Sequence, residues 1–255
     1  MYKNINGSFL YFINYQDNER ELCKMEMRCL FNREINEKYF FSDIDINASK
    51  SPFIKSKIKI IYSDESLDRM VRKIKEDNLS YDDFKVSYVK SEQGDVQYED
   101  RLEATRKIGF VVNGYPDMHK PRNPLAVTKI NGLWIFGEYE RNDFKWQKHN
   151  DKPYSYSNAL GLRMARALVN IAMKDNEEGT LIDPCCGVGT VVIEALDLGI
   201  KVKGCEISKQ IAYNARENVE FLGYLRDTIV CYDMHKIKDK YDSAMYKQKL
   251  KVKGI

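Results

Sequence analysis

The sequence predicts an α/β protein with two regions that meet near residue 150. Strand-like and helical runs are mixed over residues 1–150, whereas after residue 179 three short apolar runs alternate with two amphipathic runs. Such βαβαβ alternation is typical of a parallel sheet with helices on both faces. We therefore expect an α+β region over residues 1–150. Residues 151–255 should form an incomplete Rossmann-like domain with a doubly wound parallel sheet.

The composition fits a globular, cytoplasmic protein. Of 255 residues, 43% are hydrophobic, which is enough for the cores of two small domains. The 41 basic and 38 acidic residues give a net charge of +3, so any nucleic-acid-binding surface must be local. No apolar run approaches the roughly 20 residues of a membrane span, and we expect no signal sequence. The six cysteines lack C-x-x-C spacing, which predicts reduced thiols and no metal site.

Hydrophobic periodicity defines the expected elements of the N-terminal region. Apolar residues at helical spacing in "RELCKMEMRCLF" and "SLDRMVRKIKEDN" predict two helices that pack into the core and are not cofactor-binding boxes. Three of the six prolines fall between residues 115 and 124 and indicate a turn-rich loop. The expected strands are residues 8–14, 58–62, 84–89, 110–114 and 133–140, and the expected helices are residues 20–31, 66–78 and 98–106, the last closed by Gly109.

A run of basic and aromatic residues follows at 141–153, "RNDFKWQKHNDKP". Basic side chains contact phosphates and aromatic rings stack on bases, so the run could contact nucleic acid. The same mixture also occurs on ordinary solvated loops, and both interpretations stay open. The residues concerned are Arg141, Phe144, Lys145, Trp146, Lys148 and Lys152.

The C-terminal region changes its hydrophobic period after one more helix. Ser157 is expected to open this helix, which has Leu160, Met164, Leu168 and Ile171 on one apolar stripe. The strands that follow are expected at residues 180–183, 201–206 and 228–233, and the helices between them at residues 190–198 and 209–222.

A glycine loop leaves the first of these strands, in "LIDPCCGVGT". Glycines at this point let the backbone approach a ligand, and the next helix offers its N-terminus. Gly187 and Gly189 meet this requirement. Glu206 lies 17 residues after Gly189 at the end of the second strand, where an acid accepts hydrogen bonds from both ribose hydroxyls. NAD and S-adenosylmethionine both satisfy this pattern.

Three positions favour S-adenosylmethionine over NAD. Val192 stands where a dinucleotide fingerprint has a third glycine or alanine. Asp183, at the end of the first strand, suits the ammonium and sulfonium groups of S-adenosylmethionine but would repel a pyrophosphate. Asp233 can accept a hydrogen bond from the adenine amine, with Ile207 and Met234 as apolar faces for the ring. Each residue alone would more often be a turn or capping residue, so the prediction depends on their joint spacing.

The motif "DPCCGVGT", followed by "GCEISKQIAYNARENVEFLG", resembles the D-P-F-C-G-S-G-T signature of S-adenosylmethionine-dependent RNA methyltransferases that carry a THUMP domain, especially tRNA guanosine N2-methyltransferases. The resemblance covers about residues 98–233. "YEDRLEATRKIGFVVNG" and "NPLAVTKINGLWIFGEY" resemble the THUMP module, and "YSYSNALGLRMARALVNIA" resembles the helix before the glycine loop. The resemblance implies a THUMP-like RNA-binding module within residues 1–150, and RNA, with tRNA as the expected class, as partner.

The resemblance also implies roles for individual residues. Cys185 and Val188 depart from the commoner phenylalanine and serine of the signature, which affects the expected affinity more than the identity of the cofactor. The expected S-adenosylmethionine-binding residues are Asp183, Cys185, Gly187, Gly189 and Thr190 around the methionine moiety, Glu206 and Ile207 at ribose and adenine, and Asp233 and Met234 at adenine.

The sequence lacks the family's catalytic loop, so no catalytic residue is predicted. Such enzymes hold the target amine with Asp/Asn-Pro-Pro-Tyr after the fourth strand, but this chain has no Pro-Pro, and only 76 residues follow Gly179, where a whole sheet takes about 160. A fourth strand begins near residues 241–245, before a lysine-rich tail at 247–253. Asp151 to Tyr154 spell D-x-P-Y, which could be the catalytic motif of a circularly permuted methyltransferase. Such a motif follows a buried apolar strand, and the residues before Asp151 do not form one.

Two hypotheses about activity follow from the missing loop. The first is a truncated RNA methyltransferase that is inactive as given, with a partner chain that could complete the sheet. The second is a non-catalytic module that binds RNA or S-adenosylmethionine.

Overall fold

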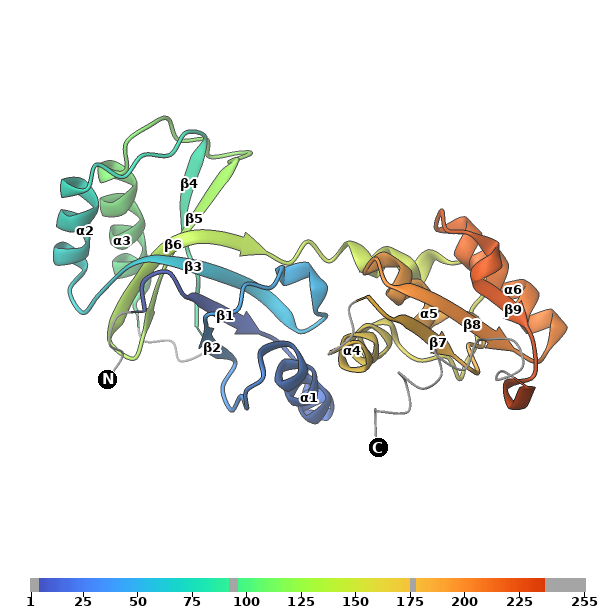
Figure 1. Cartoon of the computed structure of the whole chain (residues 1–255). Coiled ribbons are helices and arrows are strands. Elements are labelled where there is room, and N and C mark those ends of the chain that lie inside the picture. The colour runs from blue at the N-terminus through green and yellow to red at the C-terminus, as the bar shows by residue number, and fades with distance from the viewer. Residues whose placement is uncertain (1–4, 92–95, 175–177, 237–255) are drawn as a thin grey trace. The chain divides into compact units, whose positions relative to one another are not determined.

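The structure is a computed structural model that describes residues 5–91, 96–174 and 178–236. It confirms the α/β class, with one six-stranded, mostly antiparallel sheet and one three-stranded parallel sheet (Figure 1). The chain forms two compact units that alternate along the sequence. Unit 1 comprises Met1–Tyr15, Ile35–Ser49 and Phe53–Asp143, and unit 2 comprises Gln16–Glu34, Lys50–Pro52 and Phe144–Ile255. The expected domain division at residue 150 stays a prediction.

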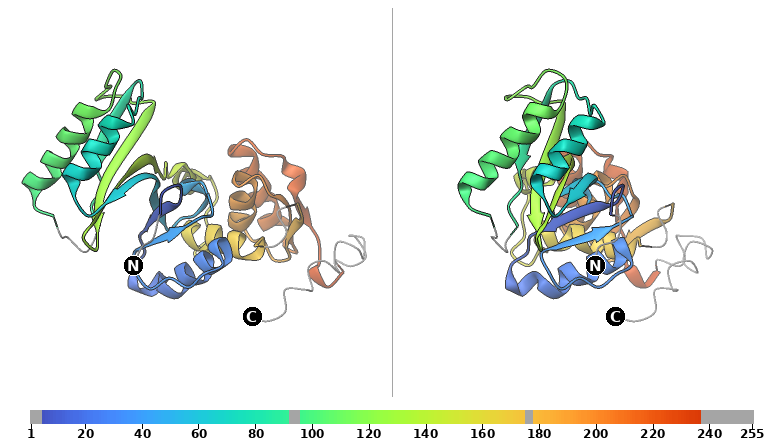
Figure 2. Two further views of the ribbon diagram at one scale, coloured as in Figure 1. Left: turned by 60° about the vertical axis from the view of Figure 1, so that its left-hand side comes forward. Right: turned by 90° about the vertical axis from the view of Figure 1, so that its left-hand side faces the viewer.

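Unit 1 is an α+β structure with the strand order β2-β1-β3-β6-β5-β4, in which only the β4–β5 pair is parallel. Helices α2 and α3 lie side by side against the sheet (Figure 2). Their buried residues, such as Met70 and Ile108, join Phe136 of the sheet in one core. The elements are β1 (Phe9–Ile13), β2 (Tyr39–Ser42), β3 (Ile54–Asp64), α2 (Leu67–Glu76), β4 (Phe84–Tyr88), α3 (Tyr98–Val111), β5 (Asn123–Ile130) and β6 (Leu133–Arg141).

Helix α3 corrects one sequence prediction. The helix does not close at Gly109 but continues to Val111, so the strand predicted at residues 110–114 is wrong. Ala104 and Ile108 are both fully buried on the same face of the helix. A glycine inside a helix costs only about 1 kcal/mol relative to alanine, and burial of the apolar face outweighs that cost.

Besides β3, β6 pairs with β5, a strand that the periodicity did not predict. The two strands are antiparallel and pair up to Ile130 and Leu133, which leaves Asn131 and Gly132 as a two-residue turn. Both turn residues have positive φ, 49° and 83°, as a type I′ hairpin turn requires. The Asn-Gly pair was therefore the sequence signal for this hairpin.

Unit 2 contains the parallel sheet β7-β8-β9. The predicted strands and helices after residue 179 are confirmed with small shifts at their ends. The fourth strand predicted at residues 241–245 and the lysines at 247–253 lie outside the described residues. The elements are α1 (Arg20–Phe31), the 3-10 helix η3 (Lys145–Asp151), α4 (Leu162–Ala172), β7 (Thr180–Asp183), α5 (Thr190–Asp197), β8 (Lys201–Glu206), α6 (Lys209–Phe221) and β9 (Ile229–Cys231).

Helix α4 begins later and buries a different face than predicted. It starts at Leu162, after Gly161 as N-cap, and not at Ser157. Leu160 and Met164 of the predicted stripe are exposed. The buried face instead carries the small and polar residues that contact neighbouring helices, so the hydrophobic pattern alone selected the wrong stripe. That face consists of Leu162, Ala165, Arg166, Ala167, Val169 and Asn170.

A buried polar network fixes η3 and α4 against α5. His149 Nδ1 lies 2.7 Å from Glu194 Oε1, and Arg166 Nη1 donates to Glu194 Oε2 and Asp197 Oδ2, both at 2.8 Å. Trp146 in the same 3-10 helix is only 3% exposed. The tryptophan therefore has no free face on which a base could stack, and the predicted stacking role for Trp146 is wrong.

One statement about membranes follows from the helices. Within the described ranges, no helix is long and apolar enough to cross a membrane.

The network predicts that the stability of the protein falls as the pH rises above neutrality. Burial lowers the pKa of His149, but the hydrogen bonds to Asp197 and Glu194 outweigh it and raise the pKa to about 8. Because this folded pKa exceeds the ordinary value of about 6.5, the contribution is complete below pH 6.5 and is lost as the pH rises through 8. The free energy of unfolding in urea, measured by tryptophan fluorescence, should fall by roughly 1 to 3 kcal/mol between pH 6.5 and 9.

His149→Gln should remove most of this pH dependence, whereas His119→Gln, at an exposed loop position, should leave it unchanged. An equal slope in the native protein and the His149 variant would show that the network does not contribute in this way.

Candidate functional site

The candidate site lies at the carboxyl edge of the parallel sheet in unit 2. Parallel strands end at the same edge, so the residues that follow β7, β8 and β9 lie near one another. Asp183 is the last residue of β7 and Glu206 the last residue of β8. Asp233 follows the end of β9 by two residues. The sheet thus brings the three predicted acids to one edge.

The glycine loop connects β7 to α5. Gly187 and Gly189 have φ of 53° and 86°, values that side chains rarely tolerate. A Cβ on Gly187 would meet nothing within 4 Å, whereas one on Gly189 would contact Ala215 of α6 at 3.6 Å. Gly187 therefore leaves open space beside the loop, whereas at Gly189 the positive φ, and not a lack of space, favours glycine.

Gly204 on β8 is a glycine that the sequence analysis did not single out. A Cβ there would lie 2.7 Å from Val192 Cγ2 and 2.9 Å from Cys186 Sγ, both closer than real Cβ atoms come. In a dinucleotide-binding motif, a glycine at the helix position equivalent to Val192 permits the helix to pack closely against the strand. Here the helix carries the larger Val192 and the strand supplies the glycine.

The acids of the site are held by backbone amides and not by basic side chains. Glu206 accepts hydrogen bonds from Gly187 N at 3.2 Å and Ser208 N at 2.9 Å. Asp183 Oδ1 accepts one from Cys185 N at 3.2 Å. Within the part of the chain that the structure describes, no lysine or arginine forms an ion pair with Asp183 or Glu206.

This electrostatic environment raises the pKa of Asp183. Burial contributes most, the hydrogen bond from Cys185 N opposes it, and the nearby charge of Glu206 adds to the rise. Two acids without a compensating cation suit a positively charged ligand, because such a ligand would relieve their repulsion.

A cavity of about 530 Å³ adjoins the glycine loop. One wall is the loop itself, including Asp183, Cys185, Gly187 and Thr190, and another is the segment 156–160 before α4. Leu168 and Ile171, from the predicted apolar stripe, also line it. The volume falls within the range of small-molecule sites, and the lining is mostly apolar.

Thr190 gives the cavity an unused polar group. Its side chain is buried, and Oγ1 has no hydrogen-bond partner among the described residues. Buried hydroxyls are normally paired, so this one is available to a ligand.

The remaining predicted residues lie outside the lining of this cavity. Ile207 is 70% exposed and Met234 43% exposed. Met234 Sδ lies 3.2 Å from Cys185 Sγ, and Glu206 contacts Gly187, so these residues adjoin the loop on its other side. Asp233 Oδ1 accepts a hydrogen bond from His235 N at 2.9 Å. The predicted residues thus fall into a group that lines the cavity and a group outside its lining, and of the second group Ile207 and Met234 are exposed.

The D-x-P-Y quartet does not stand at a strand end. Asp151 is the last residue of the 3-10 helix η3, and Tyr154 follows it in an exposed segment without regular structure. No described cluster of histidine, cysteine or acidic residues could hold a metal ion.

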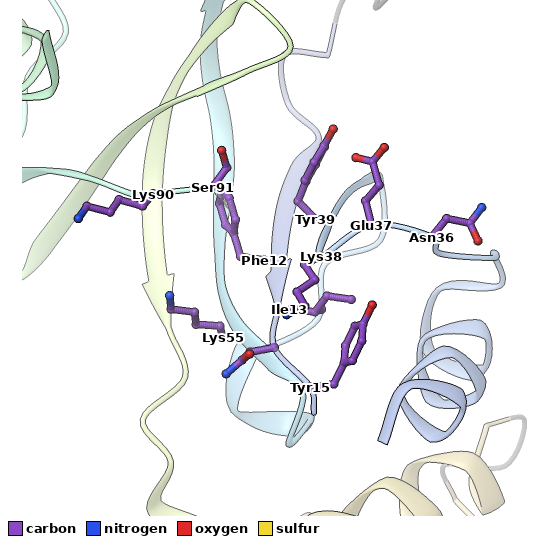
Figure 3. A pocket seen from close by; sticks show the side chains of 11 residues that line it. Phe12, Ile13, Tyr15, Asn36, Glu37, Lys38, Tyr39, Lys55, Lys90 and Ser91 are labelled. Carbon is purple, nitrogen blue, oxygen red and sulfur yellow. The ribbon is translucent and has the colours of Figure 1, made fainter. Parts of the chain in front are cut away.

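Unit 1 contains a separate pocket of about 340 Å³ (Figure 3). Lys38, Lys55 and Lys90 line it with one acid, Glu37, which gives it an excess of positive charge. Lys38 Nζ lies 5.3 Å from the centre of the Tyr15 ring. No local sequence pattern predicts this pocket, because its residues come from four separate segments.

Comparison with known proteins identifies the family. The family model N6_N4_Mtase, described as "DNA methylase", matches residues 1–217, and the chain therefore belongs to this methyltransferase family. The chain is 30% identical over 133 residues to a tRNA (guanine(10)-N2)-dimethyltransferase of Pyrococcus abyssi, a match that covers 51% of this chain and 40% of the relative. The corresponding enzyme of Methanocaldococcus jannaschii is 29% identical over 129 residues, which cover 48% of this chain and 36% of that enzyme.

Among solved structures, TrmN from Thermus thermophilus aligns with a TM-score of 0.46 and 15% identity, over 92% of this chain and 76% of that one. The chain spans about two fifths of the length of the curated relatives that it matches.

The unpaired charge at Asp183 predicts that its removal stabilises the ligand-free protein. Because the folded pKa of Asp183 is raised, the ionised carboxylate opposes folding at neutral pH, and the penalty disappears as the pH falls below the ordinary value of about 3.9. Asp183→Asn should therefore raise the free energy of unfolding at pH 7 by up to about 1 kcal/mol, a typical scale for one substitution.

Asp227→Asn, at an exposed position of the same unit, is the control and should change little. Destabilisation by Asp183→Asn in urea unfolding would mean that a compensating interaction holds the carboxylate.

Proposed function

We propose that this member of the DNA methylase family binds S-adenosylmethionine at the carboxyl edge of its parallel sheet and belongs to an RNA methyltransferase that acts on tRNA. The observation that carries the proposal is the pair Asp183 and Glu206, two acids without a basic partner beside an open glycine loop and a ligand-sized cavity. The names of the curated relatives support tRNA as the substrate class.

The residues fit the two ends of this cofactor differently. Asp183 would face the ammonium and sulfonium charges in the cavity, and the unpaired hydroxyl of Thr190 would bond the amino-acid group. Glu206 would accept hydrogen bonds from the ribose, and the exposed side chains of Ile207 and Met234 would flank the adenine. The other proposed contacts are those of Cys185, Gly187, Gly189 and Asp233.

S-adenosylmethionine supplies an activated methyl group on a sulfonium, so the protein needs chiefly to fix the geometry of attack. This chain's own residues would hold the cofactor by its charges and its ribose, and would keep water from the apolar cavity. Asp183 would remain ionised beside the bound cation, because an opposite charge lowers the pKa that burial has raised.

The open edge of the parallel sheet supports a further part of the proposal. Among the described residues, β7 pairs only with β8, so its second edge has no partner strand. We propose that a strand of a partner chain pairs with β7. In doubly wound folds, helices cover both faces of the parallel sheet, and each central strand pairs with a neighbouring strand on both of its edges.

Unit 1 is the proposed THUMP-like RNA-binding part, with the lysine-lined pocket as the contact. Lys38, Lys55 and Lys90 would neutralise phosphates, and Tyr15 would contact sugar or base (Figure 3). This assignment replaces the run at 141–153 as the first candidate, because Trp146 is buried there.

Calorimetry on the purified chain tests the cofactor. S-adenosylmethionine and S-adenosylhomocysteine should bind, and NAD should bind much more weakly or not at all. Glu206→Ala should cost roughly 1 to 3 kcal/mol of binding free energy, because the ribose hydroxyls lose their acceptor.

Glu220→Ala, an exposed position on α6, is the matched control and should bind like the native chain. Tighter binding of NAD, or unchanged binding in the Glu206 variant, would reject the cofactor assignment.

Binding of unmodified tRNA tests the RNA surface. Replacing Lys38, Lys55 and Lys90 by alanine should weaken binding and lower the slope of log affinity against log salt by roughly 2 to 3, because each phosphate contact contributes about 0.7 to 0.9. The control replaces two exposed lysines of η3, Lys145 and Lys148. A larger loss in this control than in the triple variant would move the RNA contact to η3.

A further inference from the structure

Asn218 on α6 joins two segments that are distant in sequence. Its side chain is fully buried, although asparagine is usually a surface residue. Oδ1 accepts a hydrogen bond from Tyr154 N at 2.8 Å. Nδ2 donates to Tyr154 O and to Val188 O, both at 2.9 Å.

The geometry leaves one orientation for the amide. The two atoms that face Nδ2 are carbonyl oxygens and can only accept, and the atom that faces Oδ1 is a backbone N–H and can only donate. Both donors of the side-chain NH₂ group and one lone pair of its oxygen are therefore used. Asn218 pairs with Tyr154 as a neighbouring strand would, and its remaining donor reaches the glycine loop.

The two segments that Asn218 joins belong to, or lead into, two walls of the cavity. Val188 belongs to the glycine loop, and Tyr154 leads directly into residues 156–160. Residues 153–160 are exposed and form no regular element, so this wall depends on side-chain contacts for its position. Asn218 itself lies outside the cavity lining, and within the described part of the chain its side chain forms no hydrogen bond with Glu206, Ile207 or Met234.

We infer that Asn218 is a positioning residue that sets the distance between the two walls and so determines how the cavity holds the amino-acid end of the cofactor. The inference rests on the proposed function, because it assigns the cavity to that end of S-adenosylmethionine. This positioning role predicts different effects on two kinds of ligand, whereas a merely structural role would affect both kinds equally. Loss of Asn218 should weaken ligands that enter the cavity and spare ligands that use only Glu206, Ile207 and Met234.

Calorimetry or ligand-detected NMR with two probes measures this distinction. S-adenosylhomocysteine carries the amino-acid end, and adenosine does not. Asn218→Ala should raise the dissociation constant of S-adenosylhomocysteine by about tenfold or more, because the backbone groups of both walls lose their partners. The dissociation constant of adenosine should change less than about twofold.

Two variants of Tyr154 test the position of the cavity wall without changing the buried Asn218. Tyr154→Pro removes the N–H that Asn218 accepts from, whereas Tyr154→Ala removes only the side chain and keeps both backbone bonds. The proline variant should reproduce the selective loss, and the alanine variant should bind both probes as the native chain does. This pair decides the question if Asn218→Ala fails to fold.

Equal losses for both probes in the Asn218 and proline variants, or no loss in either, would overturn the inference. If the native chain binds neither probe, the proposed function itself fails, and that result is distinct from a native chain that binds both with no selective effect of the variants.

Discussion

The close approach of α5 to β8 at Gly204 is the contact on which the candidate site depends. A Cβ at this position would collide with Cys186 of the glycine loop, Val192 of α5 and Ile229 of β9. One missing side chain thus lets three elements meet at the carboxyl edge of the sheet. Replacement by alanine would force the side chains of Cys186, Val192 and Ile229 to rearrange beneath the loop.

Around this contact, the site combines rigid backbone with unpaired charge. Gly187 and Gly189 take left-handed conformations, and Asn218 ties the loop to the segment before α4. Among the described residues, Asp183 and Glu206 accept hydrogen bonds from backbone amides alone, so their negative charge stays available. Such an arrangement costs stability in the ligand-free protein, which is the usual state of sites built for a charged ligand. The buried network of His149 and Arg166 on the other side of α5 supports the helix that the loop begins.

The sequence predicted the parallel sheet well because its signals are local. Each strand is a short apolar run, each turn carries glycine, and Asp183 and Glu206 follow from the ends of those runs. It failed where tertiary contacts decide. Burial of Ala104 and Ile108 extends α3 through Gly109, and nothing in the spacing shows that Trp146 turns into the core.

The lining of the cavity also could not be predicted from the sequence. Leu168 and Ile171 lie on the predicted apolar stripe, and they line the cavity. An apolar stripe does not reveal whether protein or ligand will cover it. No sequence pattern indicated the role of Asn218, because its three partner atoms belong to Val188 and Tyr154, which lie 30 and 64 residues away in the sequence.

A crystal structure of the chain with S-adenosylhomocysteine tests the central claim most directly. The claim predicts the homocysteine moiety in the cavity between residues 156–160 and the glycine loop, with its amino group near Asp183. It also predicts both ribose hydroxyls within hydrogen-bond distance of Glu206 and the adenine between Ile207 and Met234. A ligand bound elsewhere, or bound in the reverse direction with the adenine in the cavity, would contradict it.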